Sequence, residues 1–298
     1  MTTTVARVPF VFVDVFADRA LTGNPLALVP DTDNLSLEQM RGVAREFNQS
    51  ETTFVLRPSR ADATWRLRSF TPIGAEVFGA GHNALGAWLW MAESGRLAAD
   101  RSIFAQEIGE VVSPVSVALG GDGRAVVTMD QSVPHFGAPI DGRAELALGL
   151  GLDERDFRWE VPVVVGSTGA EHLLVPVRDR AAVDRVEPDS GRLLRVLRGA
   201  GAEGCYVWSP DPVEPSSAAY ARFFNPTVGI AEDPATGTAA GPLAAFLVSI
   251  GAVADGSEIV IEQGYALGRP SRIRVAVAGM RVRISGSGIV SAEGELLL

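Results

Sequence analysis

The chain contains no lysine, and all 26 of its basic residues are arginine. A chain without lysine cannot form a Schiff base, which excludes pyridoxal-phosphate enzymes and lysine aldolases. It also lacks a Walker lysine, which excludes P-loop hydrolysis of ATP or GTP. The absence of one residue type therefore removes several large classes of enzyme.

Cysteine and histidine are also scarce. The single cysteine, Cys205, cannot form an internal disulfide, which fits a reducing cytosol. The three histidines, His82, His135 and His172, lie far apart and do not have zinc-ligand spacing. We therefore expect a protein without a disulfide and without a metal site.

Long hydrophobic runs and excess positive charge are missing as well. The apolar run Val8 to Val13 meets Asp14 before it could form a signal-peptide core. The run Gly241 to Ala254 is too short to cross a bilayer. The net charge of −10 repels phosphate backbones and anionic lipid. We expect a soluble, cytoplasmic protein that binds neither nucleic acid nor membranes.

The 298 residues fit one large domain or two of about 150 residues, and the second half weakly repeats the first. In the clearest pair, Phe70-Thr71-Pro72 precedes a small-residue turn at Gly81, and Phe224-Asn225-Pro226 precedes one at Gly237. Each turn opens an apolar helix. Three more segment pairs follow in the same order, namely 8–13 with 161–165, 26–30 with 173–176, and 53–56 with 206–208. We interpret the repeat as a duplication.

The periodicity of apolar residues predicts many strands and few helices. Ser36 and Gln39 form a capping box that begins a surface helix. Helices over about 82–94 and 237–250 are apolar nearly all round and should be buried. Short alternating or β-branched segments predict strands at 63–70, 111–119, 125–129, 258–262, 273–277 and 281–284.

These elements predict an α+β fold of two similar lobes, each a rolled β-sheet around a central buried helix. We place the N-terminal lobe at residues 1–131, completed by 286–298, and the C-terminal lobe at 132–285.

The starts of the two buried helices are candidate anion sites. A helix N-terminus exposes free backbone N–H groups, and glycine lets a ligand approach them closely. The alternative is that Gly81 and Gly237 only permit tight turns. The segment Gly79 to Ala84 also matches a dinucleotide fingerprint, but the residues before Asp100 form no strand, so we assign no nicotinamide or flavin site.

Several motifs together resemble the phenazine-biosynthesis PhzF-like isomerase family, which shares the diaminopimelate epimerase fold. The most specific is the long run from Glu232 to Pro242, Glu-Asp-Pro-Ala-Thr-Gly-Thr-Ala-Ala-Gly-Pro. The other matching stretches are 13–16, 23–27, 44–54 and Gly81-His82. The resemblance covers essentially the whole chain and implies two lobes of similar fold.

The resemblance implies an active site that works without cofactor or metal. Its central residue is the glutamate of a Ser-Glu-Thr-Thr-Phe motif, here Glu51, which would move a proton within the substrate. For this task the carboxyl needs burial that raises its pKa towards neutrality. Without the family context, Glu51 would be interpreted as a solvated surface acid.

His82 and Asp233 match the two other polar positions of the family's site. The helix dipole favours the neutral form of a histidine at a helix N-terminus, so His82 would act as a hydrogen-bond partner. Structural roles remain open for both, as a helix cap for His82 and a turn residue for Asp233. The matched substrate-binding positions are Gly81, Gly237 and Thr238 for the carboxylate, and Asn24 and Ser50 for the pocket wall.

The chain departs from the family at Asn83, where proline is usual; this residue could add a polar contact to the substrate. The epimerase relatives place cysteines at two helix starts, where this chain has Ala80 and Ala235. Cys205 is far from both in the sequence. We therefore do not expect a two-thiol racemase.

The resemblance thus implies a cofactor-independent isomerase, commonly a homodimer, that shifts a proton and double bonds in a small unsaturated amino or hydroxy carboxylic acid. A phenazine precursor and an alkylproline-type pyrroline carboxylate are both candidates, and either would belong to secondary metabolism and antibiotic biosynthesis. Two alternatives remain: a non-catalytic relative that binds a ligand or protein, and a two-base epimerase without thiols. The latter needs a second acid near Ala80 or Ala235, where only Glu76 and Asp233 are available.

Overall fold

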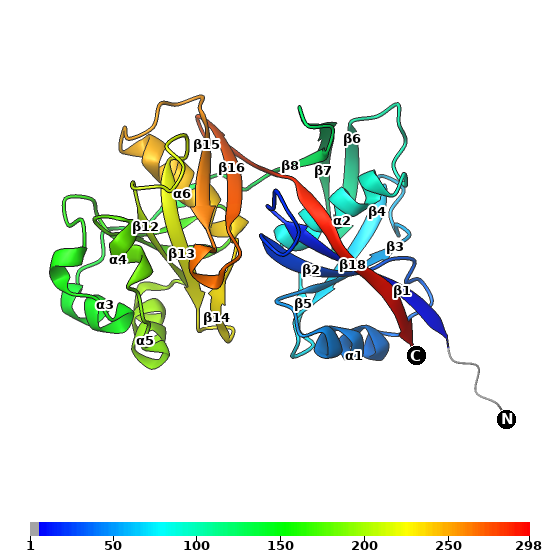
Figure 1. The fold of residues 1–298 in the computed structure, drawn as a ribbon, viewed down its shortest axis with the longest axis horizontal. Helices are drawn as coiled ribbons and strands as arrows, with labels where there is room; N and C mark the ends of the chain where they lie inside the picture. The colour runs from blue at the N-terminus through cyan, green and yellow to red at the C-terminus, as the bar shows by residue number, and fades with distance from the viewer. Residues whose placement is uncertain (1–5) are drawn as a thin grey trace. The chain divides into compact units, whose positions relative to one another are not determined.

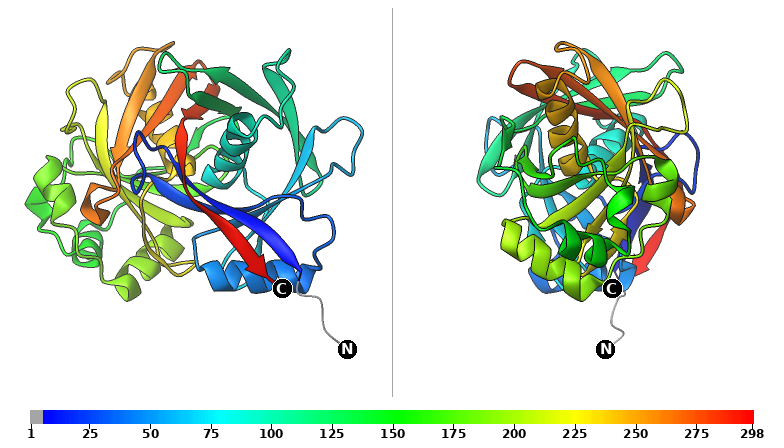
Figure 2. Two further views of the ribbon diagram at one scale, coloured as in Figure 1. Left: turned by 45° about the vertical axis from the view of Figure 1, so that its right-hand side comes forward. Right: turned by 90° about the vertical axis from the view of Figure 1, so that its left-hand side faces the viewer.

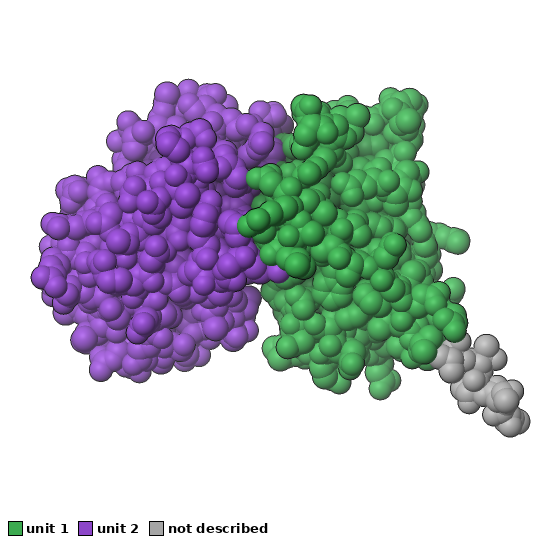
Figure 3. Space-filling view, viewed as in Figure 1, with its two compact units in different colours: residues 1–129, 286–298 green, residues 130–285 purple. Residues whose placement is uncertain are grey.

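The computed structural model describes residues 6–298, which divide into two compact units. Unit 1 comprises the described residues up to Met129 together with Gly286–Leu298, and unit 2 comprises Asp130–Ser285 (Figure 3). Each unit is described by itself below.

Unit 1 is a sheet in which neighbouring strands follow the order β18-β1-β2-β3-β4-β6-β7-β8, with β5 beside β4. The pairs β2–β3 and β4–β6 are parallel and the others are antiparallel. The strands are β1 (Arg7–Val15), β2 (Asn24–Val29), β3 (Thr52–Leu56), β4 (Trp65–Phe70), β5 (Glu76–Val77), β6 (Ile103–Ile108), β7 (Val111–Leu119), β8 (Ala125–Asp130) and β18 (Gly288–Leu297).

Unit 2 repeats this topology strand for strand, in the order β9-β10-β11-β12-β13-β15-β16-β17, with β14 beside β13. The parallel pairs, β11–β12 and β13–β15, fall at the same places. This agreement confirms the internal repeat. The strands are β9 (His135–Phe136), β10 (Val164–Ser167), β11 (Glu171–Pro176), β12 (Gly204–Ser209), β13 (Ala219–Asn225), β14 (Ile230–Asp233), β15 (Glu258–Gln263), β16 (Ser271–Ala278) and β17 (Arg281–Gly286).

One helix is buried in each unit, as the sequence predicts: α2 (His82–Glu93) in unit 1 and α6 (Gly237–Ser249) in unit 2 (Figures 1 and 2). Helix α2 contacts β18 and β1 and also β7, strands far apart in the sheet order, so the sheet curls around it. Glycine permits this close packing, because a Cβ at Gly86 would lie 2.7 Å from side-chain atoms of Leu26 and Val15.

The remaining helices are α1 (Leu37–Phe47), α3 (Arg143–Leu150), α4 (Arg180–Asp184) and α5 (Ser190–Ala200), with short 3₁₀ turns η1 (Glu154–Asp156) and η2 (Tyr265–Leu267). Helix α1 begins with the predicted capping box between Ser36 and Gln39. It buries Met40, Val43 and Ala44 against β-strand residues that include Phe54 and Phe70. An apolar face on one side of α1 therefore anchors the segment that leads into β3.

Equivalent arginine–glutamate ion pairs join the strands of the short hairpins β4–β5 and β13–β14. Arg68 donates two hydrogen bonds to Glu76, at 2.7 and 2.8 Å, and Arg222 donates two to Glu232, both at 2.8 Å. Each guanidinium also covers the ring of the phenylalanine two residues along its strand. The repeat therefore extends to side-chain contacts that the sequence comparison overlooked.

Two strands are shorter than the segments that the sequence indicates: β4 begins at Trp65 within the predicted strand 63–70, and β10 begins at Val164 within the repeated segment 161–165. In both segments the N–H of the first residue, Ala63 or Val161, closes a turn to the carbonyl oxygen three residues earlier. That donor is therefore unavailable for strand pairing. No helix within residues 6–298 has the length and apolar content that crossing a membrane requires.

Candidate active site

Glu51 lies in the connection between α1 and β3. Helix α1 ends at Phe47 and is capped by Asn48, whose φ of 52° is a left-handed conformation that asparagine tolerates better than most residues. The chain then turns through Ser50 and Glu51 into β3. This local geometry brings the Glu51 carboxyl to the start of α2, where its Oε2 is 3.1 Å from His82 Nε2.

The Glu51 carboxyl is largely removed from solvent. Its side chain is 19% exposed, and Oε2 is buried without a hydrogen bond of good geometry. Burial raises the pKa of Glu51 to about 7, and a hydrogen bond from Ser50 opposes this shift. Since Ser50 Oγ also lies 3.4 Å from His82 Nε2, the three side chains form one cluster. Near neutral pH this carboxyl can both accept and donate a proton.

Asn83 organises the turn before α2. Its Oδ1 accepts the N–H of Gly81 at 2.7 Å, and its Nδ2 donates to the carbonyl of Gly79 and to Ser69 Oγ, both at 3.0 Å. The amide is buried, and its three hydrogen bonds hold Gly81 as the residue before the helix. A contact between Asn83 and substrate stays a prediction.

Asn24, another predicted site residue, is buried as the first residue of β2. Gly23 precedes it with a φ of +68°, and a Cβ there would overlap the carbonyl oxygen of Val15. The loop that presents Asn24 therefore requires glycine at this position.

The predicted residues of unit 2 lie around the start of α6. Asp233 ends β14 and accepts a hydrogen bond from the hydroxyl of Thr236, the residue before the helix. Gln263 accepts the N–H of Thr236 at 3.1 Å and donates to its hydroxyl oxygen and to the Asp233 carbonyl. The turn from Asp233 to the helix is thus held by one buried amide.

The first turn of α6 has further supports. Gln131 donates to the carbonyl of Gly237 at 3.1 Å. A side chain at Gly241 would overlap Gln131, so glycine makes room for this contact. The hydroxyl of Thr238 lies 3.1 Å from Nε2 of His172 on β11. The first N–H groups of an α-helix generally have no intrahelical partner, which makes a helix start suitable for an anion. In α6 the N–H of Ala239 already donates to the carbonyl oxygen of Thr236.

Sequence reasoning missed three residues of this arrangement: Gln131, Gln263 and His172. None stands in a local motif, because each reaches the start of α6 from a different strand or connection. Only the pairing of those strands brings them together. In the sequence, His172 is distinguished only as one of three histidines without zinc-ligand spacing. Within the described part of the chain, His, Cys, Asp and Glu nowhere gather in groups of three that could hold a metal ion.

The two units differ at the position of Glu51. Thr52 pairs with Phe70 and Cys205 pairs with Phe224, so the counterpart of Glu51 in unit 2 is Gly204. A Cβ at Gly204 would overlap the ring of Phe223. The neighbouring Cys205 is buried, and burial raises the pKa of its thiol. Unit 2 thus carries neither a carboxyl nor an accessible thiol at this place.

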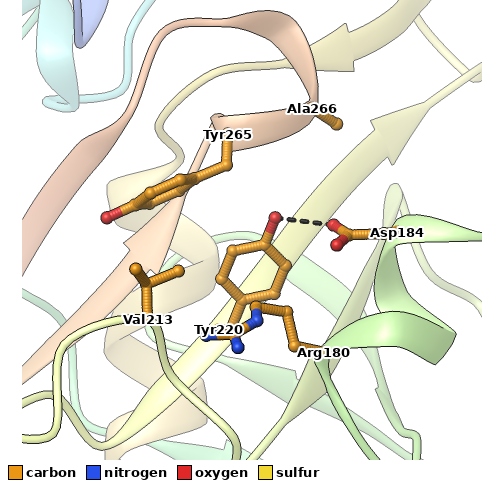
Figure 4. A pocket seen from close by; sticks show the side chains of 6 residues that line it. All are labelled: Arg180, Asp184, Val213, Tyr220, Tyr265 and Ala266. Carbon is orange, nitrogen blue, oxygen red and sulfur yellow. Dashed lines mark hydrogen bonds between the residues drawn. The ribbon is translucent and has the colours of Figure 1, made fainter.

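A separate pocket in unit 2 has a volume of about 610 Å³ and contains none of the predicted site residues. Figure 4 shows its side chains, with the Tyr220 hydroxyl donating to Asp184 at 2.6 Å. The lining residues are Arg180, Asp184, Val213, Tyr220, Tyr265 and Ala266.

Comparison with known proteins adds a second line of information. A family model described as phenazine biosynthesis-like protein matches residues 13–294. The chain is 37% identical over 306 residues to the trans-2,3-dihydro-3-hydroxyanthranilate isomerase of Pseudomonas aeruginosa, covering 97% of this chain and 99% of that protein.

Solved structures agree with this similarity. A phenazine biosynthesis protein of the PhzF family from Bacillus anthracis has a TM-score of 0.92 at 28% identity, covering 98% of this chain and 100% of that one. A hydroxyproline epimerase from Agrobacterium vitis has a TM-score of 0.66 at 13% identity, covering 100% and 93%, and shares the fold alone. These neighbours confirm the expected α+β fold class.

Proposed function

Since the chain belongs to the family of phenazine biosynthesis-like proteins and is an isomerase that acts on a small molecule, we propose that it moves a proton within a small unsaturated amino or hydroxy carboxylic acid. The first candidate substrate is trans-2,3-dihydro-3-hydroxyanthranilate, because the 37% identical relative is named for it. An unsaturated pyrroline carboxylate is the second.

The buried Glu51 carboxyl carries this proposal. As a carboxylate it removes a proton from a substrate carbon next to the π system, and the C–H electron pair enters that system. The double bonds shift, and the protonated Glu51 returns the proton to a second carbon. Substrate and product are isomers, so the reaction needs no oxidant, reductant or added group. A pKa of about 7 makes both directions of proton transfer accessible at neutral pH.

His82 and Asp233 assist the proton transfer by forming hydrogen bonds with the polar substituents of the substrate. His82 lies beside Glu51, with the two side chains 3.1 Å apart, and can hold a substrate hydroxyl or amino group next to the base. The backbone of Gly237 and the hydroxyl of Thr238 bind the carboxylate, whereas the N–H of Gly81 already donates to Asn83 Oδ1. Asn24 and Ser50 line the pocket. Asn83 acts on the turn before α2, since three hydrogen bonds already engage its amide.

A single base, Glu51, is sufficient for a proton shift, whereas an epimerisation of the two-base type needs a second acid. An epimerase without thiols needs a second acid opposite the first, and the counterpart of Glu51 in the repeat is Gly204. Of the two other acids that the sequence offers, Glu76 is paired with Arg68 and Asp233 accepts the Thr236 hydroxyl. We therefore assign the reaction to Glu51 alone. The protein is further proposed to act in the cytoplasm as a homodimer, as the family resemblance implies.

The test is turnover of trans-2,3-dihydro-3-hydroxyanthranilate by the Glu51→Gln variant, followed by NMR in D₂O. Glutamine keeps the shape of the side chain and removes the titrating group, so turnover should fall at least about 10²–10⁴-fold. The wild-type reaction should place deuterium only at the receiving carbon, with less than one equivalent if Glu51 is shielded from water between the two steps.

The matched control is Glu46→Gln, which changes an exposed glutamate on α1 and should leave turnover unchanged. Near-normal turnover by Glu51→Gln would refute the mechanism. If the wild-type protein does not turn over trans-2,3-dihydro-3-hydroxyanthranilate but does turn over the pyrroline carboxylate, the second candidate replaces the first as the proposed substrate.

A further inference from the structure

We propose that His172 is a positioning residue that donates its Nε2–H to the Thr238 hydroxyl oxygen and so directs the hydroxyl proton towards a bound carboxylate. This inference rests on the proposed function, in which Thr238 contacts the substrate carboxylate. Nothing in the sequence pattern or in the family resemblance stated above assigns a role to His172.

The geometry places the two groups in hydrogen-bond contact. His172 is the second residue of β11 and is buried, and its Nε2 lies 3.1 Å from Thr238 Oγ1. Thr238 is the second residue of α6 and is partly exposed. The histidine thus supports, from the interior, a hydroxyl that a ligand can reach from outside.

The surroundings of the other ring nitrogen decide the tautomer. Nδ1 of His172 is buried without a hydrogen-bond partner. It faces Gly204, where an added Cβ would lie 3.2 Å from Nδ1, and the ring meets Phe223 edge to face at 4.9 Å. An N–H at Nδ1 would therefore be buried without an acceptor. The proton therefore belongs on Nε2, where it meets the Thr238 oxygen.

Protonation of both nitrogens is disfavoured by the same burial. Burial alone lowers the pKa of His172 to about 4, so the ring is neutral at physiological pH. The neutral ring can only donate at Nε2, so it occupies one lone pair of the Thr238 hydroxyl oxygen. The hydroxyl proton of Thr238 is then free to donate to another group. That proton then points to an acceptor, which a substrate carboxylate supplies.

Glycine at position 204 has a consequence for this arrangement. A side chain there would displace both Phe223 and His172. The position that carries the base in unit 1 is therefore left empty in unit 2, which lets the imidazole lie against the strand and reach the start of α6.

A ligand-free measurement tests the tautomer first. We expect the imidazole ¹⁵N spectrum of the full chain at pH 7 to show His172 as the neutral Nε2–H form, with the signal assigned by its loss in His172→Gln. An Nδ1–H tautomer or a charged ring would overturn the proposal, whatever the substrate is.

A matched pair of variants tests the consequence for binding. Glutamine can place an amide N–H near the position of Nε2, whereas asparagine reaches only the position of Nδ1. His172→Asn should weaken binding of 3-hydroxyanthranilate about tenfold, the effect of one lost hydrogen bond, and His172→Gln should restore it. Thr238→Val should weaken binding to a similar extent, with no further loss in the His172→Asn/Thr238→Val double variant.

The probe 2-aminophenol, which is 3-hydroxyanthranilate without its carboxylate, separates positioning from general damage. Its affinity should not change between wild type and His172→Asn. Equal loss for both probes, equal behaviour of the Gln and Asn variants, or a wild-type chain that does not prefer the carboxylate probe would overturn the inference. If the contrast appears without turnover of the dihydro compound, the proposed function alone fails. If turnover appears without the contrast, this inference alone fails.

Discussion

At the scale of single residues, the surroundings of Glu51 disfavour the ionised form of its carboxyl. Its carboxyl is buried, and burial raises its pKa to about 7 although a hydrogen bond from Ser50 opposes the shift. The ionised form is therefore poorly accommodated in the folded protein. A proton-transferring group gains from this poor accommodation, because its two forms become nearly equal in free energy.

The same shift predicts a pH-dependent stability. In the unfolded chain Glu51 ionises near 4.5, and in the folded chain near 7, so the folded state binds more protons between these values. Its contribution to the free energy of unfolding is complete below pH 4.5 and falls as the pH rises towards 7, by up to about 3 kcal/mol. Glu51→Gln removes this loss, so chemical unfolding at pH 8 should show a variant more stable than wild type.

The stability difference should shrink as the pH falls towards 4.5, and the exposed Glu46→Gln variant should not show it. A Glu51→Gln protein that is less stable than wild type at pH 8 would contradict the argument. Gain of stability together with loss of turnover would indicate that burial of this carboxyl serves the reaction.

At the scale of elements, the hairpins β4–β5 and β13–β14 each contain an arginine–glutamate ion pair, and the two pairs differ in burial. The Arg222–Glu232 pair is 10% and 12% exposed, whereas Arg68–Glu76 is 21% and 22% exposed. Arg222 also donates to the backbone carbonyls of Val183, Asp184 and Val186, at and just after the end of α4. It therefore ties β14, which carries Asp233, to β13 and α4 together.

Removal of the two arginines should have unequal effects. Arg222→Met leaves Glu232 and three carbonyl groups without their partner, so we expect a loss of about 3–5 kcal/mol in the free energy of unfolding. Arg68→Met should cost no more than about 2 kcal/mol, since Glu76 can regain water. Urea unfolding of both variants checks the order, and an equal or reversed order would show that burial is not the deciding factor.

At the scale of the whole molecule, the duplicated topology carries unequal chemistry. The repeat keeps the strand order, the buried helix and a buried glutamate on an inner strand: Glu107 on β6 accepts N–H groups of Ser59 and Arg60, and Glu262 on β15 accepts those of Val213 and Glu214. The site position differs, since one unit has Glu51 and the other has Gly204. The two units therefore share one scaffold, and only unit 1 has a carboxyl at this position.

A base that moves a proton between two carbons needs no Lewis acid. We therefore expect turnover to survive exhaustive dialysis against a chelator, and the purified protein to show no absorbance band above that of its aromatic residues. Dialysis followed by assay, with a metal-supplemented sample as the control, checks this. Activity that is lost with the chelator and restored by one metal would contradict it.

The proposed homodimer has an equally direct check. Light scattering on the eluting protein should give twice the 31.4 kDa chain mass. A monomer mass at micromolar concentration would refute the homodimer and leave the assignment of Glu51 untouched.

The sequence by itself determined those features that depend on neighbouring residues. All-round apolar composition predicted the buried helices α2 and α6, alternation predicted β7 from Val111 to Leu119, and the spacing of Ser36 and Gln39 predicted the start of α1. Each of these features depends on helix or strand periodicity or on helix caps, which involve residues only a few positions apart in the sequence.

Tertiary structure alone decided which of these residues form a site. Burial of Glu51 beside His82, and therefore its raised pKa, depends on how the connection after α1 meets the start of α2. The contacts of His172 with Thr238 and of Gln263 with Thr236 join residues 66 and 27 positions apart. Sheet register and helix packing create these proximities, and they arise from the summed burial of the whole core, which no local pattern encodes.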